Sequence, residues 1–236
     1  MAAETAPPVG PPVLGWSRRP LPPRSPMVGR WCRLEPLDPA RHASSLFAAF
    51  RSDTEGRGWT YLPYGPFANE AAFREWLDGV AGTDDPLFHT ISDEHGEPVG
   101  VASFLRITPD AGSIEVGHIH YAPRLQRTRA ATETMYLMMR RAFDELGYRR
   151  YEWKCDALNA PSRRAAERLG FTYEGTFRQH VVTKGRNRDT AWYSIIDAEW
   201  PAIRAAFEAW LDPANFDERG KQRRSLEALR ASTARS

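Results

Sequence analysis

The sequence predicts an α/β (α+β) fold in which about seven strands form a central sheet flanked by helices. Segments with the period of a strand alternate with segments of helical period, in the order β-α-α-β-β-β-α-β-α-β-β. Two strand pairs are separated by short polar turns, which indicates hairpins and therefore antiparallel neighbours. Hydrophobic residues make up 42% of the 236 residues, which suits a globular core.

The first half of the chain contains two capped helices and four strands. Asp38 and Asn69 stand where the N-caps of helices 38–51 and 69–80 are expected. A hairpin turn is expected at His95-Gly96, and Gly117 inside a strand indicates a bulge. The predicted strands are 29–37, two within 87–107, and 113–122.

The second half begins with a helix that carries an apolar stripe and stops at Gly147. A strand over 148–157 follows, and then a short helix that starts after Asn159 and closes at Gly170. A hairpin of strands 171–183 and 190–198 comes next, with its turn assigned to residues 184–189. The last predicted helix spans 199–210.

Composition divides the chain into three parts. Residues 1–26 form a Pro-rich arm that we expect to dock through Leu14 and Trp16, residues 27–200 form the domain, and residues 201–236 form a helix and a basic tail. The two ends, residues 1–30 and 217–236, each carry a net +3, so the body between them carries −4 although the whole chain is +2. An acidic body argues against nucleic acid as a partner.

Location is predicted from what the sequence does not contain. Two cysteines far apart in the chain make no disulfide framework, and no apolar signal segment or run of roughly 18 apolar residues is found. We therefore expect a cytoplasmic protein with no membrane association.

The segment RLQRTRAATE, residues 124–133, gathers three arginines at the start of a helix. A helix N-terminus already carries free N–H groups and a partial positive charge, so additional arginines favour a bound anion. A solvated arginine surface is the alternative interpretation.

Several motifs in order resemble the GNAT superfamily of acyl-CoA-dependent N-acetyltransferases, and most closely its RimJ/RimL type. They are the strand IEVGHIHYAP, the arginine-rich loop, and NAPSRRAAERLGF followed by EG. The resemblance spans roughly residues 27–200. It implies a mixed, mostly antiparallel sheet with a splayed strand pair that holds acetyl-CoA, and no metal.

The resemblance also implies which residues bind the co-substrate. The family loop has Gln or Arg, two residues, Gly, one residue, then Gly or Ala; Gln126 and Ala131 fit, but Arg129 stands where Gly is usual. The loop residues are expected at the diphosphate, the strand backbone along the pantetheine arm, and Asn159 beside that arm. The implied acetyl-CoA residues are Ile119, His120, Tyr121, Gln126, Arg127, Thr128, Arg129, Ala130, Ala131, Thr132, Asn159 and Ser162.

Amine acetylation needs a base for the ammonium and an acid for the leaving thiolate. Glu115 is the first candidate base, with a structural ion pair as the alternative. His118 and His120, two apart on one strand, are further candidates for proton relay, with a packed histidine pair as the alternative. Ser162 is favoured as the acid, although it also fits a helix cap with Asn159, and Tyr193 competes with it.

The aromatic segment WTYLPYGPF, residues 59–67, is expected to wall the acceptor pocket. Trp59, Tyr61, Tyr64 and His118 are the candidate substrate residues.

The sequence thus predicts acetyl transfer from acetyl-CoA to a primary amine, either a protein N-terminus or a small molecule. A GNAT-fold module that binds CoA, a ribosome or nucleic acid without turnover is the alternative. Pairing of two chains stays open, with the terminal helix as a candidate interface.

Overall fold

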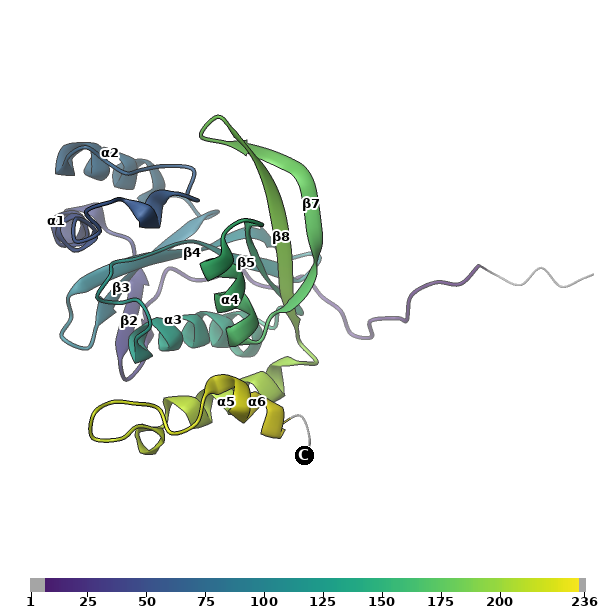
Figure 1. Cartoon of the computed structure of the whole chain (residues 1–236). Helices are drawn as coiled ribbons and strands as arrows, with labels where there is room; N and C mark the ends of the chain where they lie inside the picture. The colour runs from purple at the N-terminus through teal and green to yellow at the C-terminus, as the bar shows by residue number, and fades with distance from the viewer. Residues whose placement is uncertain (1–6, 234–236) are drawn as a thin grey trace, which may run out of the picture.

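The computed structural model describes residues 7–233 of the chain, which form one eight-stranded sheet with helices on both faces (Figure 1). Residues 1–6 of the predicted arm and 234–236 of the predicted tail lie outside the described residues. The helices and strands are β1 Met27–Val28, β2 Cys32–Pro36, α1 Pro39–Phe50, η1 Arg57–Trp59, α2 Glu70–Ala81, β3 Leu87–Asp93, β4 Pro98–Thr108, β5 Ser113–Tyr121, α3 Arg129–Arg140, η2 Arg141–Glu145, β6 Arg150–Asp156, α4 Ala160–Leu169, β7 Thr172–Thr183, β8 Arg186–Ile196, α5 Trp200–Leu211, η3 Pro213–Asn215 and α6 Leu226–Thr233.

The sheet has the strand order β1-β2-β3-β4-β5-β6-β8-β7. Every neighbouring pair is antiparallel except β5 and β6, which run parallel because the crossover through α3 joins them. The predicted fold, a mixed and mostly antiparallel sheet flanked by helices, is confirmed.

Two hydrophobic cores lie on opposite faces of this sheet. Helices α1 and α2 pack over β3 and β4 around Leu46, Phe73 and Leu77. Helices α3, α4 and α5 cover the other face (Figure 1), around the methionines of α3 and Tyr151. Each helix group therefore covers one face of the sheet, and side chains on the two faces lie in different surroundings.

Local sequence signals set most of the boundaries. The carboxylate of Asp38 accepts from the N–H groups of α1, and the side chain of Asn69 accepts from Ala72 N at 2.9 Å. Gly147 and Gly170 adopt φ of +70° and +106°, left-handed values that glycine reaches without steric cost, and they end their helices as predicted. Helix α3 finishes in the π-helical turn η2 before Gly147.

One predicted boundary was wrong, and one short strand was not predicted. The turn assigned to residues 184–189 is only Lys184-Gly185, with φ of +50° and +72°, so β8 begins four residues earlier than expected. The polar residues 186–189 suggested a loop, but they belong to the exposed end of a long hairpin that reaches toward α2 (Figure 1). The two-residue strand β1 was also not predicted.

The arm docks through Trp16 but not through Leu14, which is 89% exposed. The indole N–H of Trp16 donates to Asp110 O at 3.0 Å, and the buried Arg141 donates to the carbonyls of Ser25 and Pro26. The prediction that Leu14 anchors the arm was therefore wrong.

The C-terminal segment packs against the domain. Helix α5 buries its aromatic residues against α3, where Phe207 stacks on Tyr136, and α6 packs on α5 and α4. The apolar face of α5 is thus covered within the chain, and pairing of two chains through the terminal helix stays a prediction.

Candidate active site

Strands β5 and β6 pair over only four residues and then part. The ladder runs from Ser113↔Arg150 to Val116↔Trp153, whereas β6 stays paired with β8 as far as Asp156↔Thr190. The remaining residues of β5 therefore leave their backbone groups on this side without a strand partner. We call this opening between β5 and β6 the split.

A bulge in β5 lies where the split opens. Val101↔His120 and Ser103↔Gly117 are paired with β4, so two β5 residues face the single residue between Val101 and Ser103. His118, one residue after the predicted position Gly117, adopts φ +50°. A bulge adds local twist to the strand, which helps β5 turn away from β6.

The loop after β5 leads directly into α3. Leu125 N and Gln126 N bond back to Ala122 O, and Thr128 caps the helix by accepting from Ala131 N at 3.1 Å. Arg127 takes the left-handed φ of +62° between these turns. The amides of Arg129 and Ala130, at the first helical positions, have no acceptor inside the helix, so they are available to an anion.

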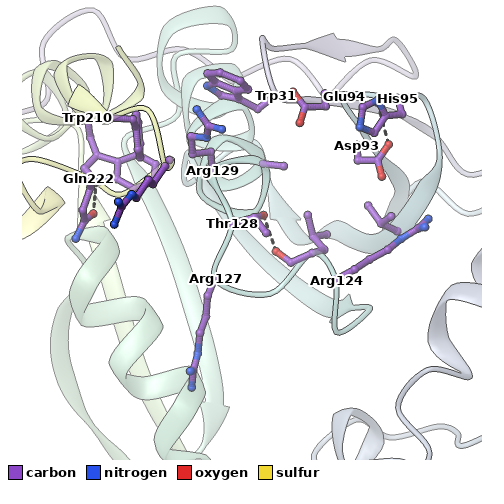
Figure 2. Close-up of a pocket in the computed structure, with 16 residues that line it drawn as sticks. Trp31, Asp93, Glu94, His95, Arg124, Arg127, Thr128, Arg129, Trp210 and Gln222 are labelled. Carbon is purple, nitrogen blue, oxygen red and sulfur yellow. Dashed lines mark hydrogen bonds between the residues drawn. The ribbon is translucent and has the colours of Figure 1, made fainter. Parts of the chain in front are cut away.

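The three arginines of the loop point in different directions (Figure 2). The guanidinium of Arg129 lies between two aromatic rings, 3.9 Å from the centre of Trp31 and 4.9 Å from that of Phe216. Its side chain therefore turns away from the loop, which answers how an arginine fits where the family usually has glycine. Arg127 extends on the opposite side of the loop from Trp31 (Figure 2).

A cavity of about 580 Å³ adjoins this loop. Its wall continues through the β3–β4 turn on one side and the C-terminal segment around Phe216 and Arg219 on the other. None of the residues at the split belongs to this wall. The lining residues are Trp31, Asp93, Glu94, His95, Val99, Arg124, Leu125, Arg127, Thr128, Arg129, Ala130, Trp210, Phe216, Arg219, Gly220 and Gln222.

These features fit the diphosphate of acetyl-CoA. Free amides at a helix N-terminus and nearby guanidinium groups are the donors that bind phosphate oxygens. Thr132 is less available than expected, because its hydroxyl donates to Thr128 O and accepts from Arg168 at 3.2 Å. The side-chain amide of Gln126 donates to Tyr121 O at 3.0 Å and so supports the loop from within.

Ser162 lies at the point where the strands part. Trp153 is the last residue of β6 paired with β5, and its indole N–H donates to Ser162 Oγ at 3.0 Å. Asn159 Oδ1 accepts from Ser162 N at 3.1 Å, so the expected helix cap is present. Cys155 is a further neighbour of Ser162. Burial raises the pKa of its thiol, and a hydrogen bond from Ser162 opposes this shift.

Tyr193 is enclosed by α4. Its ring is fully buried, and its hydroxyl accepts from Arg163 Nε at 3.0 Å and donates to Glu167 Oε1 at 3.2 Å. Burial raises the pKa of this hydroxyl. A hydroxyl with both partners supplied by one helix has the surroundings of a structural group.

Glu115 lies on the opposite face of the sheet from Trp153 and Ser162. It is 3% exposed, and its oxygens are 2.8 Å from Arg106 Nη1 and 2.8 Å from Lys154 Nζ. Burial raises the pKa of Glu115 above its ordinary 4.5, although the two cations oppose this shift. Lys154 also pairs with Glu152 at 2.7 Å.

The two histidines of β5 pack against the aromatic segment 59–67. His120 is buried and stacks on Trp59, with ring centres 3.7 Å apart. His118 Nδ1 lies 3.1 Å from the hydroxyl of Tyr64. Burial lowers the pKa of each histidine to about 4, so both are neutral at pH 7 and match the expected packed pair.

The aromatic segment forms a wall beside the split, but not all of its residues face outward. Trp59 is 5% exposed and belongs to the core, whereas Tyr61 and Tyr64 are partly exposed. The Tyr61 hydroxyl donates to Leu158 O, which ties the segment to the loop after β6. Of the candidate substrate residues, Tyr61, Tyr64 and His118 are thus partly exposed, whereas Trp59 is buried.

Sequence reasoning missed several residues here. Lys184 Nζ donates to Trp59 O at 2.8 Å and Gly65 O at 2.6 Å, so the β7–β8 turn bridges to the aromatic segment. Lys154 and Arg106, the partners of Glu115, were also missed. The alternation of a strand places Lys154 on the same face as Glu152, so the sequence could have indicated their pairing. The contact of Lys184 depends on tertiary structure alone.

Comparison with known proteins agrees with this geometry. The family model described as an acetyltransferase (GNAT) domain matches residues 32–172. A solved GCN5-related N-acetyltransferase from Brucella melitensis is 49% identical, with 92% of this chain and 99% of that chain covered and a TM-score of 0.90. A probable GNAT-family acetyltransferase from Chromobacterium violaceum is 41% identical over 82% of this chain and 97% of the other, with a TM-score of 0.77.

A curated relative is more distant. The uncharacterized N-acetyltransferase p20 of Bacillus licheniformis is 27% identical over 152 residues, which cover 59% of this chain and 80% of that protein.

The chain belongs to the GNAT family of acetyltransferases. It is therefore an N-acetyltransferase that uses acetyl-CoA as its co-substrate and transfers the acetyl group to an amine. No helix within residues 7–233 is long and apolar enough to span a membrane. The same residues contain no cluster of three or more potential metal-ligating His, Cys, Asp or Glu side chains.

Proposed function

We propose that this acetyltransferase acts by direct attack of a primary amine on the thioester, without a covalent enzyme intermediate. The observation that carries the proposal is the arrangement of Glu115 and Ser162 about the split. Glu115 is paired with Glu152 in the ladder, and Ser162 is bonded to Trp153 of the next pair, Val116↔Trp153, on the opposite face of the sheet. A base and an acid so placed act on opposite sides of a carbonyl held between the strands.

The co-substrate binds along the split and the loop in this proposal. The amides of Arg129 and Ala130 bind the diphosphate, and Arg127 adds a charge-assisted bond. The backbone of Ile119, His120 and Tyr121 pairs with the amides of the pantetheine arm. Arg129 contributes its amide rather than its side chain, because the side chain is stacked on Trp31.

Each end of the reaction has a candidate group. Glu115 takes the proton of the attacking ammonium, directly or through water, and its raised pKa favours this step. Ser162 donates to the departing sulfur and is held for this by Trp153. Tyr193 is the weaker acid candidate, because α4 already binds its hydroxyl.

The acceptor lies between the aromatic segment and the β7–β8 hairpin, which Lys184 joins. A RimJ/RimL type of acceptor, the N-terminus of a ribosomal protein, remains a proposal. The solved Salmonella typhimurium acetyl transferase that modifies the N-terminal serine of ribosomal protein L7/L12 is 20% identical with a TM-score of 0.63, so it supports the fold alone.

Thiol release from acetyl-CoA tests the proposed function. A panel of peptides with free N-termini and of small primary amines should give release with at least one class. Release with peptides alone would favour the ribosomal-protein type, and release with small amines alone would favour a small-molecule enzyme. Binding of CoA without release across the panel would contradict the proposal and favour a non-catalytic module.

The role of Glu115 has its own test. In Glu115→Gln the fall in rate toward acid pH should disappear, because the group whose protonation causes it is gone. A rate–pH profile of unchanged shape would exclude Glu115 as the base.

A further inference from the structure

Among the described residues on the acceptor side of the sheet, Arg188 is a partly shielded cation without a hydrogen-bond or ion-pair partner. Glu115, Glu152 and Glu174 pair there with Arg106, Lys154 and Arg150. Arg188 is on the same face of β8 as Trp192, whose ring carries the ammonium of Lys154 at 3.7 Å. Within residues 7–233, the side chain of Arg188 makes no hydrogen bond and no ion pair, and its Nε is shielded from solvent.

Arg188 lies next to the split. The last pair of β6 and β8 is Asp156↔Thr190, so Arg188 stands two residues beyond the end of β6, where β8 stays paired with β7 only. The positive charge of Arg188 acts on two other strands, because it helps to lower the pKa of His118 on β5 and of His180 on β7. Between Arg188 and the hairpin tip, Lys184 fixes the hairpin to the aromatic segment.

A guanidinium whose Nε is shielded from water and unpaired lacks that hydrogen bond unless a ligand supplies an acceptor. Glu115, Glu152 and Glu174 bind other cations, so none of these three carboxylates pairs with Arg188. An anionic oxygen group is the natural partner, since guanidinium binds carboxylate and phosphate through paired hydrogen bonds.

We infer that Arg188 binds an anionic group of the acceptor, so the substrate is a primary amine that also bears a carboxylate or a phosphate. This inference rests on the proposed acetyl transfer and narrows its acceptor class. The net negative charge of residues 31–216 does not describe the surroundings of this side chain.

Matched pairs of probes test the inference by calorimetry on the full chain with CoA present. 4-Aminobutyrate is compared with butylamine, and phosphoethanolamine with ethanolamine, so each acid has a control of similar skeleton that lacks the anionic group. We expect at least one acid to bind about tenfold to a hundredfold more tightly than its control. The pair that shows the preference distinguishes carboxylate from phosphate.

Variants then assign the preference to one side chain. Arg188→Gln should abolish it and Arg188→Lys should keep part of it, whereas Arg186→Gln, on the exposed end of the same strand, should leave it unchanged. Thermal unfolding checks that each variant is folded. Equal affinity for acid and control in the natural chain, no measurable binding of either acid, or a preference that survives Arg188→Gln would overturn the inference.

The two proposals fail in different ways. Thiol release with amines that lack an anionic group, and no preference for acids, would overturn the inference and leave the proposed function standing. Tight binding of an acid with no thiol release from any amine would support the anion site and contradict the proposed function.

Discussion

At the scale of single residues, the indole N–H of Trp153 connects the end of a strand ladder to a candidate acid. Trp153 is the last residue of β6 that β5 pairs with, and its hydrogen bond fixes Ser162 Oγ at that position. The oxygen is thus held as an acceptor, and donation to the departing sulfur requires the hydroxyl hydrogen to turn away from Cys155.

We expect Ser162→Ala to lower the turnover rate about tenfold or more while the Kd for CoA stays unchanged. Removal of the hydroxyl takes away the proton donor but not the backbone that binds the co-substrate. Steady-state kinetics and calorimetry measure the two quantities. Tyr193→Phe serves as the comparison: a larger rate loss in Tyr193→Phe than in Ser162→Ala would reverse the assignment.

Charge reversal tests the loop. Arg127→Glu should weaken CoA binding about tenfold or more, because a cation beside the diphosphate becomes a repelling anion. Arg74→Glu on the exposed side of α2 makes the same charge change far from the loop in sequence and should leave affinity unaltered. Equal affinity of Arg127→Glu and the natural chain would place Arg127 in solvent.

At the scale of elements, the parts of the fold with local causes were predictable. Asp38, Asn69 and Asn159 cap their helices, and Gly147 and Gly170 end theirs, because these interactions involve neighbours along the chain. The start of β8 was not predictable, because residues 186–189 are all polar, and the first two are exposed, although they belong to a strand. The stacking of Arg129 on Trp31 and Phe216 joins three distant segments, so no local pattern indicates it.

One buried carboxylate of α3 holds the β1–β2 connection. Glu133 is 5% exposed and accepts from the backbone N–H groups of Arg30, Trp31 and Cys32 at 2.6–2.9 Å. Glu133→Gln should reduce the free energy of unfolding by about 1–3 kcal/mol, because an amide nitrogen cannot accept these bonds.

Chemical denaturation measures this loss, with Glu75→Gln on the exposed side of α2 as the control. A surface change of that kind is expected to stay within about 0.5 kcal/mol. A similar small effect for both variants would show that the three bonds add nothing to stability.

At the scale of the whole molecule, the sheet separates two chemical environments. One face carries α3, α4 and the candidate acid, and the other carries the ion pairs around Glu115 together with α1 and α2. The sequence indicated the split by resemblance, whereas the unpaired Arg188 emerged only from the assembled sheet.

Buried neutral histidines predict how the whole fold responds to acid. Burial lowers the pKa of His89, His118 and His120 to about 4 from an ordinary 6.5. Between pH 6.5 and 4 the unfolded chain binds protons that the native state does not, so stability is full above pH 6.5 and falls as the pH drops through this window. Each histidine should cost about 1 kcal/mol at pH 5.5 relative to pH 7.5.

Urea denaturation at both pH values measures this loss. His89→Leu removes the histidine farthest from the candidate active site residues in sequence and should reduce the loss by about a third. An acid-induced loss of the same size in His89→Leu would mean that His89 titrates equally in both states.

The most direct test of the central claim is a crystal structure of this chain with bound CoA. The account predicts diphosphate oxygens about 3 Å from the amides of Arg129 and Ala130, and a pantetheine arm paired with β5 inside the split. A nucleotide bound elsewhere with this turn empty, or β5 and β6 joined by backbone hydrogen bonds beyond Trp153, would contradict it.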